Sequence, residues 1–490
     1  MAIAFESTFR SLPESLFSQV HPSAVRAPGL IRLNEKLADE LGLDADWLRG
    51  AEGLATLSGN GVLAETDPIA LAYAGHQFGH FVPRLGDGRA ILLGEVVDRT
   101  GKRRDIQLKG AGRTPYSRRG DGRAALGPVL REYIVSEAMA ALGVPTTRAL
   151  AAVATGERVQ RETGLPGAVL TRVAASHIRV GTFQFAAAQG DIAVLRSLAD
   201  YVIARHYPDA ATAENRYLAL LGHVVRAQAE LIAHWMSLGF IHGVMNTDNM
   251  AVSGETIDYG PCAFLDAYDP AKVFSSIDEA GRYAFGNQPR VAVWNLARLA
   301  EALLPLLDAD QDAAIASAEA VLREFEPLFA EAHLGRMRAK LGLSTDLPED
   351  AALIEGLLLT MRAGQADFTR TFRALAQAPG DDGAPADLAG LFADPDQLTP
   401  WYARYQDRLQ RDPRSPEDRA QTMLGTNPRF IPRNHRIEEV IRAAVDTGDT
   451  APFHALVDVL AAPFADQPAN ARYAAPPVPG EEVLRTFCGT

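Results

Sequence analysis

The chain has 490 residues, more than one ordinary hydrophobic core accommodates, so we expect two or three packed units. Its composition, 47% hydrophobic and 22% charged, is that of a globular protein, and the formal net charge of −13 argues against non-specific binding to nucleic acid or to an anionic membrane. Two cysteines, Cys262 and Cys488, exclude a disulfide framework and a four-cysteine zinc site. With no signal-peptide pattern and no window resembling a membrane span, we expect a cytoplasmic protein.

The first part of the chain contains two segments with different sequence patterns. Residues 1–70 read as short amphipathic helices separated by turns and carry no chemical signal. The runs 89–97 and 104–109 are rich in aliphatic and β-branched residues and are separated by turn residues, which is typical of an antiparallel hairpin. A loop rich in Arg and Gly, 110–123, follows the hairpin.

A single helix and two more strands are expected next. The helix is predicted at about 127–142, with Pro128 suited to its first turn and Gly143 to its C-terminal cap. Strand-like runs follow at 147–153 and 167–173. Together with the hairpin they predict a small sheet that carries one helix.

After Gly190 the sequence is mostly helical. The runs 195–207 and 217–235 have the apolar spacing of half-buried helices, and 436–445 predicts a further helix. A stretch rich in Pro, Gly and Asp, 379–395, predicts an exposed linker or long loop. The order of elements therefore favours an α+β protein, with a sheet in the first half and helices in the second.

A basic segment stands out in this acidic chain. Between Arg84 and Arg131 there are twelve Lys or Arg residues against five Asp or Glu. A solvated charged face would explain such a run about as well as a binding site. Glycines interleaved with the cations favour a site for a compact anion such as a phosphate chain.

Two features of this segment suit phosphate binding. R-L-G-D-G-R places Gly86 and Gly88 before a strand, where a kinase has the turn that covers its phosphates, although a plain hairpin turn would also explain them. Lys109 ends the next strand, from which it could reach a phosphate or merely occupy an edge. The following helix offers Glu132 and Glu137 as ion-pair partners, and its periodicity does not choose between them.

The stretch I-H-G-V-M-N-T-D-N-M (241–250) resembles a phosphotransferase catalytic loop that lacks its base. His242 and Asn249 have the kinase spacing, but Val244 stands where the catalytic Asp is expected. Asp258 follows in I-D-Y-G, where kinases have D-F-G. An amide oxygen from Asn249 and a carboxylate from Asp258 are ligands that suit a hard divalent cation.

Two further pairs of residues could bind ligands. Arg172 and Arg179 lie near the place of a kinase hinge, where arginine is unexpected; they hint at phosphate deep in the cleft, with simple salt bridging as the alternative. His76 and His80 have the spacing of a helical zinc pair, but two glycines disfavour a helix and no third ligand is evident.

Several long motifs identify the chain as similar to the selenoprotein O family. These are Y-A-G-H-Q-F-G, Q-L-K-G-A-G-R-T-P-Y-S-R-R-G-D-G-R, H-G-V-M-N-T-D-N-M and a cysteine, Cys488, third from the end. The resemblance implies a protein-kinase-like bilobal fold, with a small β-rich N-lobe and a large helical C-lobe. It implies a protein adenylyltransferase that binds ATP in a flipped orientation and transfers AMP, or UMP from UTP, to Ser, Thr or Tyr hydroxyls of proteins with release of pyrophosphate.

The resemblance also assigns roles to residues. Asp248 corresponds to the proton acceptor, and Asn249 and Asp258 to the ligands of Mg²⁺ or Mn²⁺. Lys109 would contact phosphate and pair with Glu132. The nucleotide-contacting positions are Gly86, Gly88, Arg89, Lys109, Asp121, Gly122, Arg172, Arg179 and Asp258, of which the two arginines would hold the inverted phosphate tail.

The organisation expected on this basis has four parts. These are an N-terminal extension (1–70), an N-lobe (71–180), a helical C-lobe (181–380) and a C-terminal helical segment with a cysteine-bearing tail (381–490). By resemblance Cys262 and Cys488 form a reversible disulfide that acts as a redox gate; two unrelated thiols are the alternative.

Two other functions stay open. One is a small-molecule or protein kinase with an atypical base, which would transfer the γ-phosphate. The other is an inactive scaffold that binds ATP, although Lys109, Asn249 and Asp258 argue against it.

Overall fold

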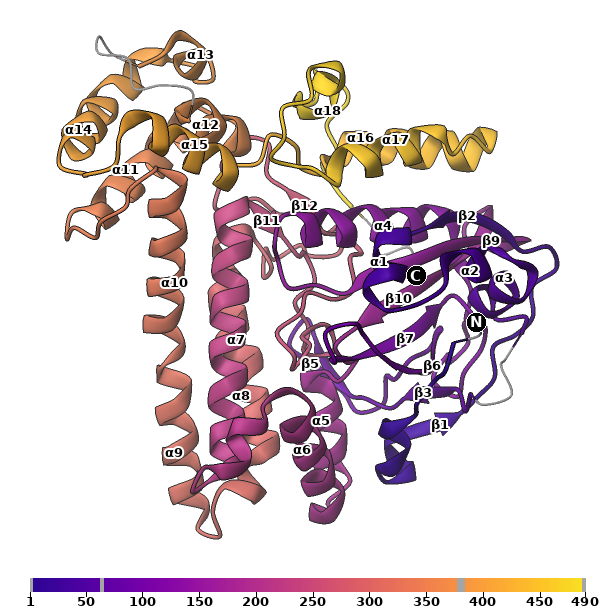
Figure 1. Cartoon of the computed structure of the whole chain (residues 1–490). Helices are drawn as coiled ribbons and strands as arrows, with labels where there is room; N and C mark the ends of the chain where they lie inside the picture. Colours follow the sequence, from indigo (N-terminus) through magenta and orange to yellow (C-terminus); the bar gives the residue numbers. More distant parts are fainter. Residues whose placement is uncertain (1–2, 62–65, 377–383, 487–490) are drawn as a thin grey trace.

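The computed structural model describes residues 3–61, 66–376 and 384–486. Figure 1 shows a lobe built around a β-sheet and a second lobe built from long helices. All but two short strands come from the first part of the chain, and most helices come from the rest. The predicted α+β class, with a β-rich N-terminal lobe and a helical C-terminal lobe, is therefore confirmed.

One antiparallel sheet forms the first lobe. Its strands lie in the order β1 (Phe17–Gln19), β3 (Ile69–Leu71), β6 (Ala90–Val97), β7 (Arg103–Lys109), β10 (Gly164–Ala174), β9 (Arg148–Gln160) and β2 (Gly29–Leu33), with β8 (Ala124–Ala125) paired to β10. The predicted hairpin is confirmed as β6 and β7, in which Leu92 faces Gln107. Alternating side chains of these strands fill the core beneath the sheet.

The first seventy residues differ from the expectation of helices and turns alone. They do form α1 (Glu35–Glu40), α2 (Ala45–Arg49) and α3 (Ala51–Ser58), but they also supply β1, β2 and the start of β3. These strands are three to five residues long and pair with partners far away in the sequence, such as β2 with β9. The expected four-part division of the chain remains a prediction.

The helix expected at 127–142 is α4 (Leu126–Ala141), and it lies against the sheet. Pro128 is in its first turn, and Gly143 follows its end with φ +81°, a conformation that favours glycine. Two C-terminal helices, α16 (Asn434–Arg442) and α17 (Ala451–Leu460), pack on the outer side of α4 (Figure 1). Helices α16 and α17 thus support α4, the helix that carries Glu132.

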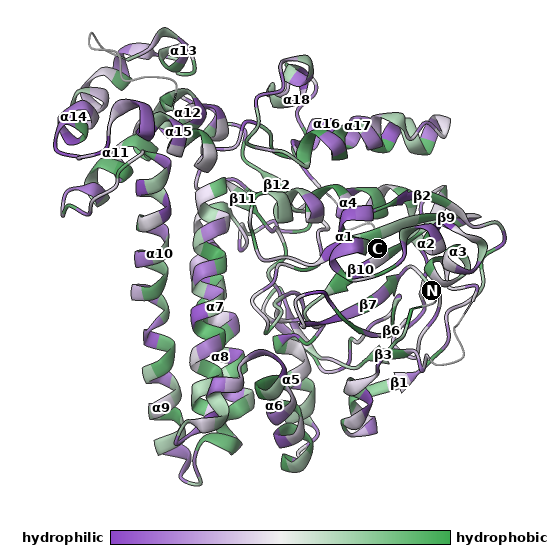
Figure 2. Ribbon diagram, in the orientation of Figure 1, coloured by the Kyte–Doolittle hydropathy of each residue, from purple (hydrophilic) through white to green (hydrophobic). Residues whose placement is uncertain are grey.

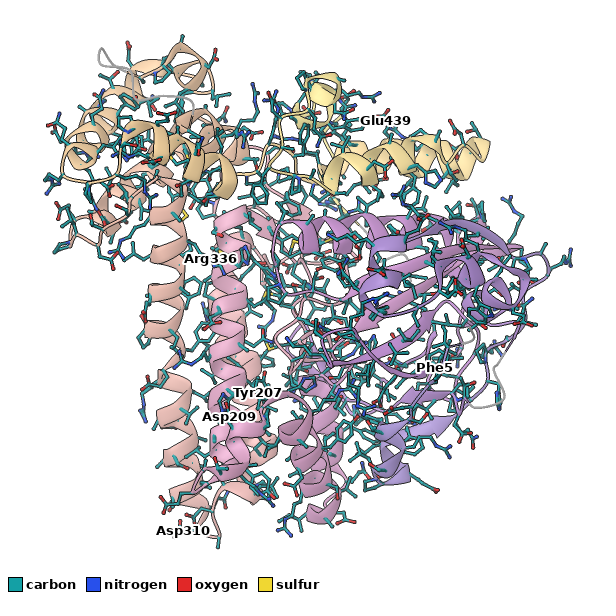
Figure 3. All side chains as sticks on the ribbon, in the orientation of Figure 1. Phe5, Tyr207, Asp209, Asp310, Arg336 and Glu439 are labelled. Carbon is teal, nitrogen blue, oxygen red and sulfur yellow. The ribbon has the colours of Figure 1, made fainter. Side chains whose placement is uncertain are left out.

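Side-chain contacts connect α4 with α16 and α17. Arg131 donates to the Glu438 carboxylate at 2.7 Å, and the rings of Tyr133 and Phe453 meet edge to face at 5.4 Å. On the far side of α16, Glu439, labelled in Figure 3, accepts from Arg436 at 2.9 Å.

The second lobe is organised around α7 (Arg216–Leu238). It packs against α8 (Gln288–Leu307), α9 (Gln311–Arg323) and α10 (Phe325–Lys340). Figure 2 shows hydrophobic and hydrophilic residues alternating along α7 and α10, as expected of helices buried on one side. The other elements of the lobe are α5 (Val180–Ala188), α6 (Ile192–His206), β11 (Phe240–Ile241), β12 (Ala263–Phe264), α11 (Asp350–Ala363), α12 (Phe368–Leu375), α13 (Ala386–Ala389), α14 (Thr399–Gln410), α15 (Pro416–Thr426) and α18 (Ala471–Ala474).

The helices predicted at 195–207, 217–235 and 436–445 are confirmed as α6, α7 and α16. The stretch 379–395 falls partly outside the described residues, and Ala386–Ala389 within it form α13. Within the described ranges, none of the helices is both long and apolar enough to traverse a lipid bilayer.

Candidate active site

A cleft of about 640 Å³ is lined by residues of both lobes. This volume is in the range of small-molecule and cofactor sites. The cleft brings together every residue that was expected to bind nucleotide or metal or to act on a proton: Gly86, Gly88, Arg89, Lys109, Asp121, Gly122, Glu132, Arg172, Arg179, Asp248, Asn249 and Asp258. Residues as far apart in the sequence as Gly86 and Asp258 therefore share one cavity.

The glycine turn before β6 is anchored by Asp87, the residue between its two glycines. The buried Asp87 carboxylate accepts from the Leu71 amide at 3.2 Å and from Gln107 at 3.1 Å. Gly86 has φ +75°, and a Cβ there would stand 2.3 Å from the Tyr116 ring. The turn therefore requires glycine both for its backbone conformation and for the close approach of the aromatic ring.

A second glycine turn follows in the Arg/Gly loop. Gly122 has φ +70°, and a Cβ would stand 2.1 Å from the carbonyl oxygen of Gly112. Its neighbour Asp121 accepts from Arg161 at 3.0 Å, an ion pair on the partly exposed rim of the cleft. At Gly122 itself the backbone is packed so closely that no side chain larger than that of glycine fits.

The interior of the cleft holds a cluster of charges around Asp258. Its carboxylate accepts from Lys109 at 2.8 Å, from Arg172 at 2.6 Å and from Arg179 at 2.7 Å. Burial alone would raise the pKa of the Asp258 carboxyl, but Arg172, Lys109 and Arg179 outweigh it and hold that pKa well below its usual range. Three cations thus converge on one anion at the bottom of the cavity.

Glu132 and Glu137 of α4 have different partners. Glu132 accepts from Lys109 at 2.6 Å and from Arg172 at 2.5 Å. Glu137 instead accepts from Arg148 at 2.8 Å, outside the cleft. Five residues of α-helix turn the side chain by about 140°, so the two carboxylates cannot serve the same site.

The loop that carries Asp258 is tied to the loop 241–250, which resembles a catalytic loop. Asp258 has φ +65°, a left-handed conformation that Asp tolerates better than most residues. The buried His242 ring donates through Nε2 to the Ile257 carbonyl at 2.9 Å, directly before it. His242 therefore links the two loops through this hydrogen bond.

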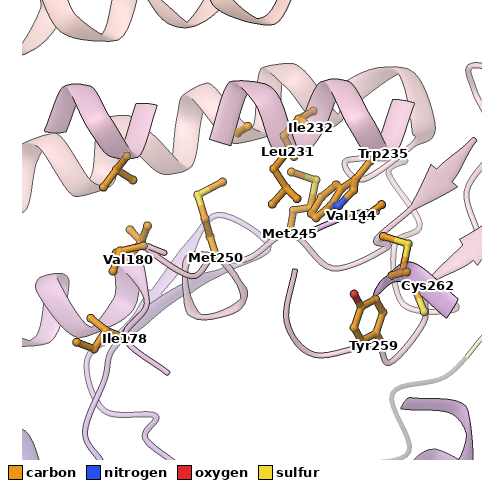
Figure 4. Packing of buried hydrophobic residues seen from close by; sticks show 14 of the residues in the cluster. Val144, Ile178, Val180, Leu231, Ile232, Trp235, Met245, Met250, Tyr259 and Cys262 are labelled. Carbon is orange, nitrogen blue, oxygen red and sulfur yellow. The ribbon is translucent and has the colours of Figure 1, made fainter. Parts of the chain in front are cut away.

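The loop 241–250 packs against the core of the helical lobe. Met245 and Met250 bury their side chains near Leu231 and Trp235 of α7, as Figure 4 shows. Val244, at the position of a kinase's base, is buried and lines the cleft, and its carbonyl accepts from the Asn249 amide group at 3.0 Å. This bond orients Asn249 with its Nδ2 toward the loop, which leaves its amide oxygen available for a ligand.

Asp248 is the one carboxylate of this loop, and its two oxygens differ. Oδ2 accepts from Gln77 Nε2 at 3.1 Å, whereas the buried Oδ1 has no partner among the described residues. A Cβ on Gly75 would stand 2.5 Å from Oδ1, so only glycine leaves room for this oxygen. Burial raises the pKa of Asp248 to about 6, against the opposing effects of Gln77 and Arg179. The group can therefore be ionised at neutral pH and can accept a proton.

The donor set suits a hard divalent cation. Asn249 offers an amide oxygen and Asp258 a carboxylate, and both line the same cleft. The described residues contain no group of three or more His, Cys, Asp and Glu that could hold a metal by themselves. A cation here would take its remaining ligands from phosphate oxygens and water, as is usual for Mg²⁺ in phosphoryl-transfer sites.

Two remaining expectations concern the cysteines and the histidine pair. Cys262 is buried, and burial raises the pKa of its thiol to about 12; Cys488 lies outside the described residues. His76 and His80 lie on β4 (Gly75–Gln77) and β5 (His80–Val82), so they do not share a helix.

The basic segment divides between the cleft and other surfaces. Arg89 and Lys109 line the cleft, as does Arg123. Arg99 instead pairs with Asp39 at 2.7 Å, and Arg104 with Asp98 at 2.9 Å. The local excess of cations therefore reflects a phosphate-sized site only in part.

Three residues that shape the site were not predicted from the sequence. Gln77 holds Asp248, Asp87 anchors the glycine turn, and the Tyr73 ring lies 4.6 Å from the Arg179 guanidinium, in cation–π contact. Tyr73 and Gln77 belong to the Y-A-G-H-Q-F-G motif. The two glycines of this motif disfavour a helix, but no local pattern predicts what the segment contacts.

Comparison with known proteins agrees with this geometry. The family model described as "Protein adenylyltransferase SelO" matches residues 1–461. Proteins named protein nucleotidyltransferase YdiU are 62% identical in Bradyrhizobium sp. (strain ORS 278), over 99% of both chains, and 60% identical in Rhizobium meliloti (strain 1021), over 100% of both. A third, from Methylorubrum populi, is 62% identical over 99% of both chains. The resemblance drawn from the motifs is confirmed, as is the prediction of an enzyme that transfers nucleotidyl groups. The chain belongs to the SelO family of protein adenylyltransferases.

Proposed function

We propose that this protein transfers AMP from ATP to a hydroxyl side chain of another protein, with ATP bound so that its triphosphate tail points into the cleft. The acceptor oxygen forms a bond to the α-phosphorus, the bond from that phosphorus to the bridging oxygen of the β-phosphate breaks, and pyrophosphate leaves. The acceptor's proton passes to Asp248. UTP as a second donor, which would give UMP transfer, is part of the same proposal.

The observation that carries the proposal is the convergence of Lys109, Arg172 and Arg179 at the bottom of the cleft. Guanidinium groups bind phosphate oxygens through paired hydrogen bonds and suit adenine poorly. Arg172 and Arg179 are almost fully buried, so a ligand that replaces the carboxylate of Asp258 beside them must itself be an anion. A triphosphate tail supplies that anion.

The position of the base supports the same orientation. With the tail inward, the α-phosphate is nearer the mouth of the cleft than the γ-phosphate is. A base placed for γ-transfer would then serve no purpose, which accounts for Val244. The buried Oδ1 of Asp248 accepts no hydrogen bond from any described residue, and the pKa of the group is about 6, properties that suit a general base at neutral pH.

Asn249 and Asp258 are the residues that would hold Mg²⁺ or Mn²⁺. When bound, such an ion supplies positive charge that stabilises the phosphate oxygens as the bond to the leaving group breaks. Asp258 would have to exchange its arginine contacts for the ion, and the phosphates would take its place beside the arginines. Lys109, held by Glu132, remains as the third cation in either state.

One experiment separates the proposal from its rivals. Intact protein is incubated with ATP and Mg²⁺, and its mass and that of a mixture of acceptor proteins are measured. A gain of one AMP agrees with the proposal, and a gain of one phosphate indicates a kinase with an atypical base. No gain on any protein would indicate an ATP-binding scaffold. Label transfer from α-labelled but not γ-labelled ATP gives the same answer independently.

We also propose a cytoplasmic enzyme, without a nucleic-acid or membrane partner, that is gated by a disulfide between Cys262 and Cys488. Thr486, two residues before Cys488, donates through Oγ1 to the Pro261 carbonyl at 2.6 Å, so the tail passes beside Cys262's neighbour. The buried, weakly acidic Cys262 thiol is a poor attacking group, so oxidation would be slow. Oxidant-dependent mobility on non-reducing gels, present in the wild type and absent in Cys488→Ser, supports the gate; equal mobility rejects it.

A further inference from the structure

The acceptor protein has to reach Asp248, and two segments outside the nucleotide residues form that side of the cleft. Gln77 and Phe78 belong to the β4–β5 hairpin, and Ile277 to the segment that follows β12. Ile277 is 60% exposed, an unusual state for a large apolar side chain at the mouth of an active site. An incoming hydroxyl must pass these side chains.

The tip of the hairpin is held in a strained shape. Phe78 has φ +52°, which is rare for a bulky residue. Its amide donates to Asn246 at 3.1 Å, and its ring meets Tyr283 at 5.2 Å, so the catalytic loop and the following segment hold the conformation. Such strain persists where the position of the backbone matters to function.

The outer face of the hairpin continues this surface. Phe81 is 44% exposed and packs on the His76 ring at 5.0 Å; His76 in turn meets Trp294 of α8 at 5.1 Å. Arg282 stacks on Trp294 at 4.7 Å, and its guanidinium carbon lies 3.9 Å from the position of a Cβ on Gly79. Apolar rings and a cation therefore surround the hairpin tip beside the base.

Arg282 is the charged residue of this surface with no ion-pair partner in the described part of the chain. Arg298, which also stacks on Trp294, already pairs with Glu301 at 2.5 Å. The Asp278 carboxylate accepts from the Arg282 and Tyr283 amides, so it is engaged with backbone rather than with the guanidinium. The stacked rings hold the Arg282 guanidinium in place without a carboxylate in ion-pair contact among the described residues, in a protein whose net charge is −13.

On the basis of the proposed function, we infer that Phe81, Ile277, Arg282 and Trp294 form an acceptor-docking surface. It fits an extended segment of another protein, in which the hydroxyl residue is flanked by an apolar side chain and by a carboxylate. The apolar side chain would rest on Ile277 or Phe81, and the carboxylate would pair with Arg282. Placing a flexible segment this way brings its hydroxyl within reach of Asp248 at a lower entropic cost.

The test uses the full-length protein and serine peptides that place Asp, Lys or Leu at each of the three positions on either side of the serine. Transfer from α-labelled ATP is measured as kcat/KM for each peptide. The wild type should prefer an Asp peptide over its Lys counterpart by about tenfold at one or more positions, which is the range of a charge-assisted hydrogen bond. Arg282→Glu should reverse that preference, with the change in the peptide KM and an unchanged KM for ATP.

Arg290→Glu is the matched control, because Arg290 is an exposed arginine at the start of α8, the helix that carries Trp294. It makes the same change in net charge and should keep the preference for Asp. Equal preferences in wild type and Arg282→Glu would overturn the inference, as would a reversal in both variants or peptides that are never modified while self-labelling proceeds. If no AMP transfer to any protein occurs at all, the proposed function fails instead.

Discussion

Replacing Asp258 with Asn removes the anion on which three cations converge, and the structure sets the size of the effect. Taking one partner from a buried ion pair costs about 3–5 kcal/mol. Here Glu132 still compensates Lys109 and Arg172, so we expect the lower end, about 3 kcal/mol. With an unfolding entropy of about 1 kcal/mol/K for a chain of this length, the melting temperature should fall by about 3 °C.

The same substitution should strengthen the binding of a phosphate chain. In the wild type, tripolyphosphate without metal has to displace the Asp258 carboxylate from Arg172 and Arg179. In Asp258→Asn the neutral amide no longer competes, and we expect metal-free tripolyphosphate to bind at least about tenfold more tightly, equivalent to about 1.4 kcal/mol. AMP transfer should nevertheless be lost, because a metal ligand is missing.

The assay is the melting temperature as a function of tripolyphosphate concentration, since a ligand of the folded state stabilises it by mass action. Asp350→Asn is the matched control: this buried carboxylate pairs with Arg338 at 2.9 Å and Arg408 at 2.6 Å, far from the cleft. It should lower the melting temperature without changing the affinity for tripolyphosphate. Weaker or unchanged binding to Asp258→Asn would refute the reasoning that the cluster is a phosphate site.

Three further predictions follow from single side chains. Asp248→Asn should reduce AMP transfer by about 10²–10⁴-fold with little effect on the KM for ATP, measured with α-labelled ATP; unchanged turnover would remove its role as base. Gly75→Ala should lower kcat as well, because its Cβ displaces the Asp248 carboxylate, while tripolyphosphate binding stays as in the wild type; full activity would contradict the close approach. Lys340 is buried beside Phe368 and Phe372 with no carboxylate partner among the residues that the structure describes, and burial lowers its pKa to about 7. Since this pKa lies below that of the unfolded chain, the native state loses stability as pH falls toward 7. Lys340→Met should therefore stabilise the protein at pH 7 in urea unfolding, with a gain that shrinks by about 1.4 kcal/mol per pH unit up to about pH 10; a gain independent of pH would contradict the assignment.

The elements that the sequence predicts correctly are those with a long, regular pattern. Helix α7 buries one face over many residues, so the spacing of its apolar residues identifies it. Strand β6 and helix α4 are buried almost throughout, and they are identified by their aliphatic runs and by the turn and cap residues at their ends. Strands β1 and β2 are too short to show alternation, and their partners β3 and β9 are distant in sequence. Only tertiary pairing makes them strands.

The residues of the site likewise fall into those that the sequence predicts and those that only the folded structure shows. Motif spacing located Lys109 and Asn249, because chemistry fixes which residue types it needs. The spacing could not choose between Glu132 and Glu137, since both are on one helix and only the packing of α4 decides which faces the cleft. The contact of Gln77 with Asp248 joins positions 171 residues apart, and no local pattern predicts it.

The inward orientation of the triphosphate is tested most directly by a crystal structure with a non-hydrolysable ATP analogue and Mg²⁺. We predict the terminal phosphate in hydrogen-bond contact with Arg172 and Arg179, and the α-phosphate nearer to Asp248 than the terminal phosphate is. Adenine stacked beside those arginines, with the terminal phosphate directed toward solvent, would contradict it.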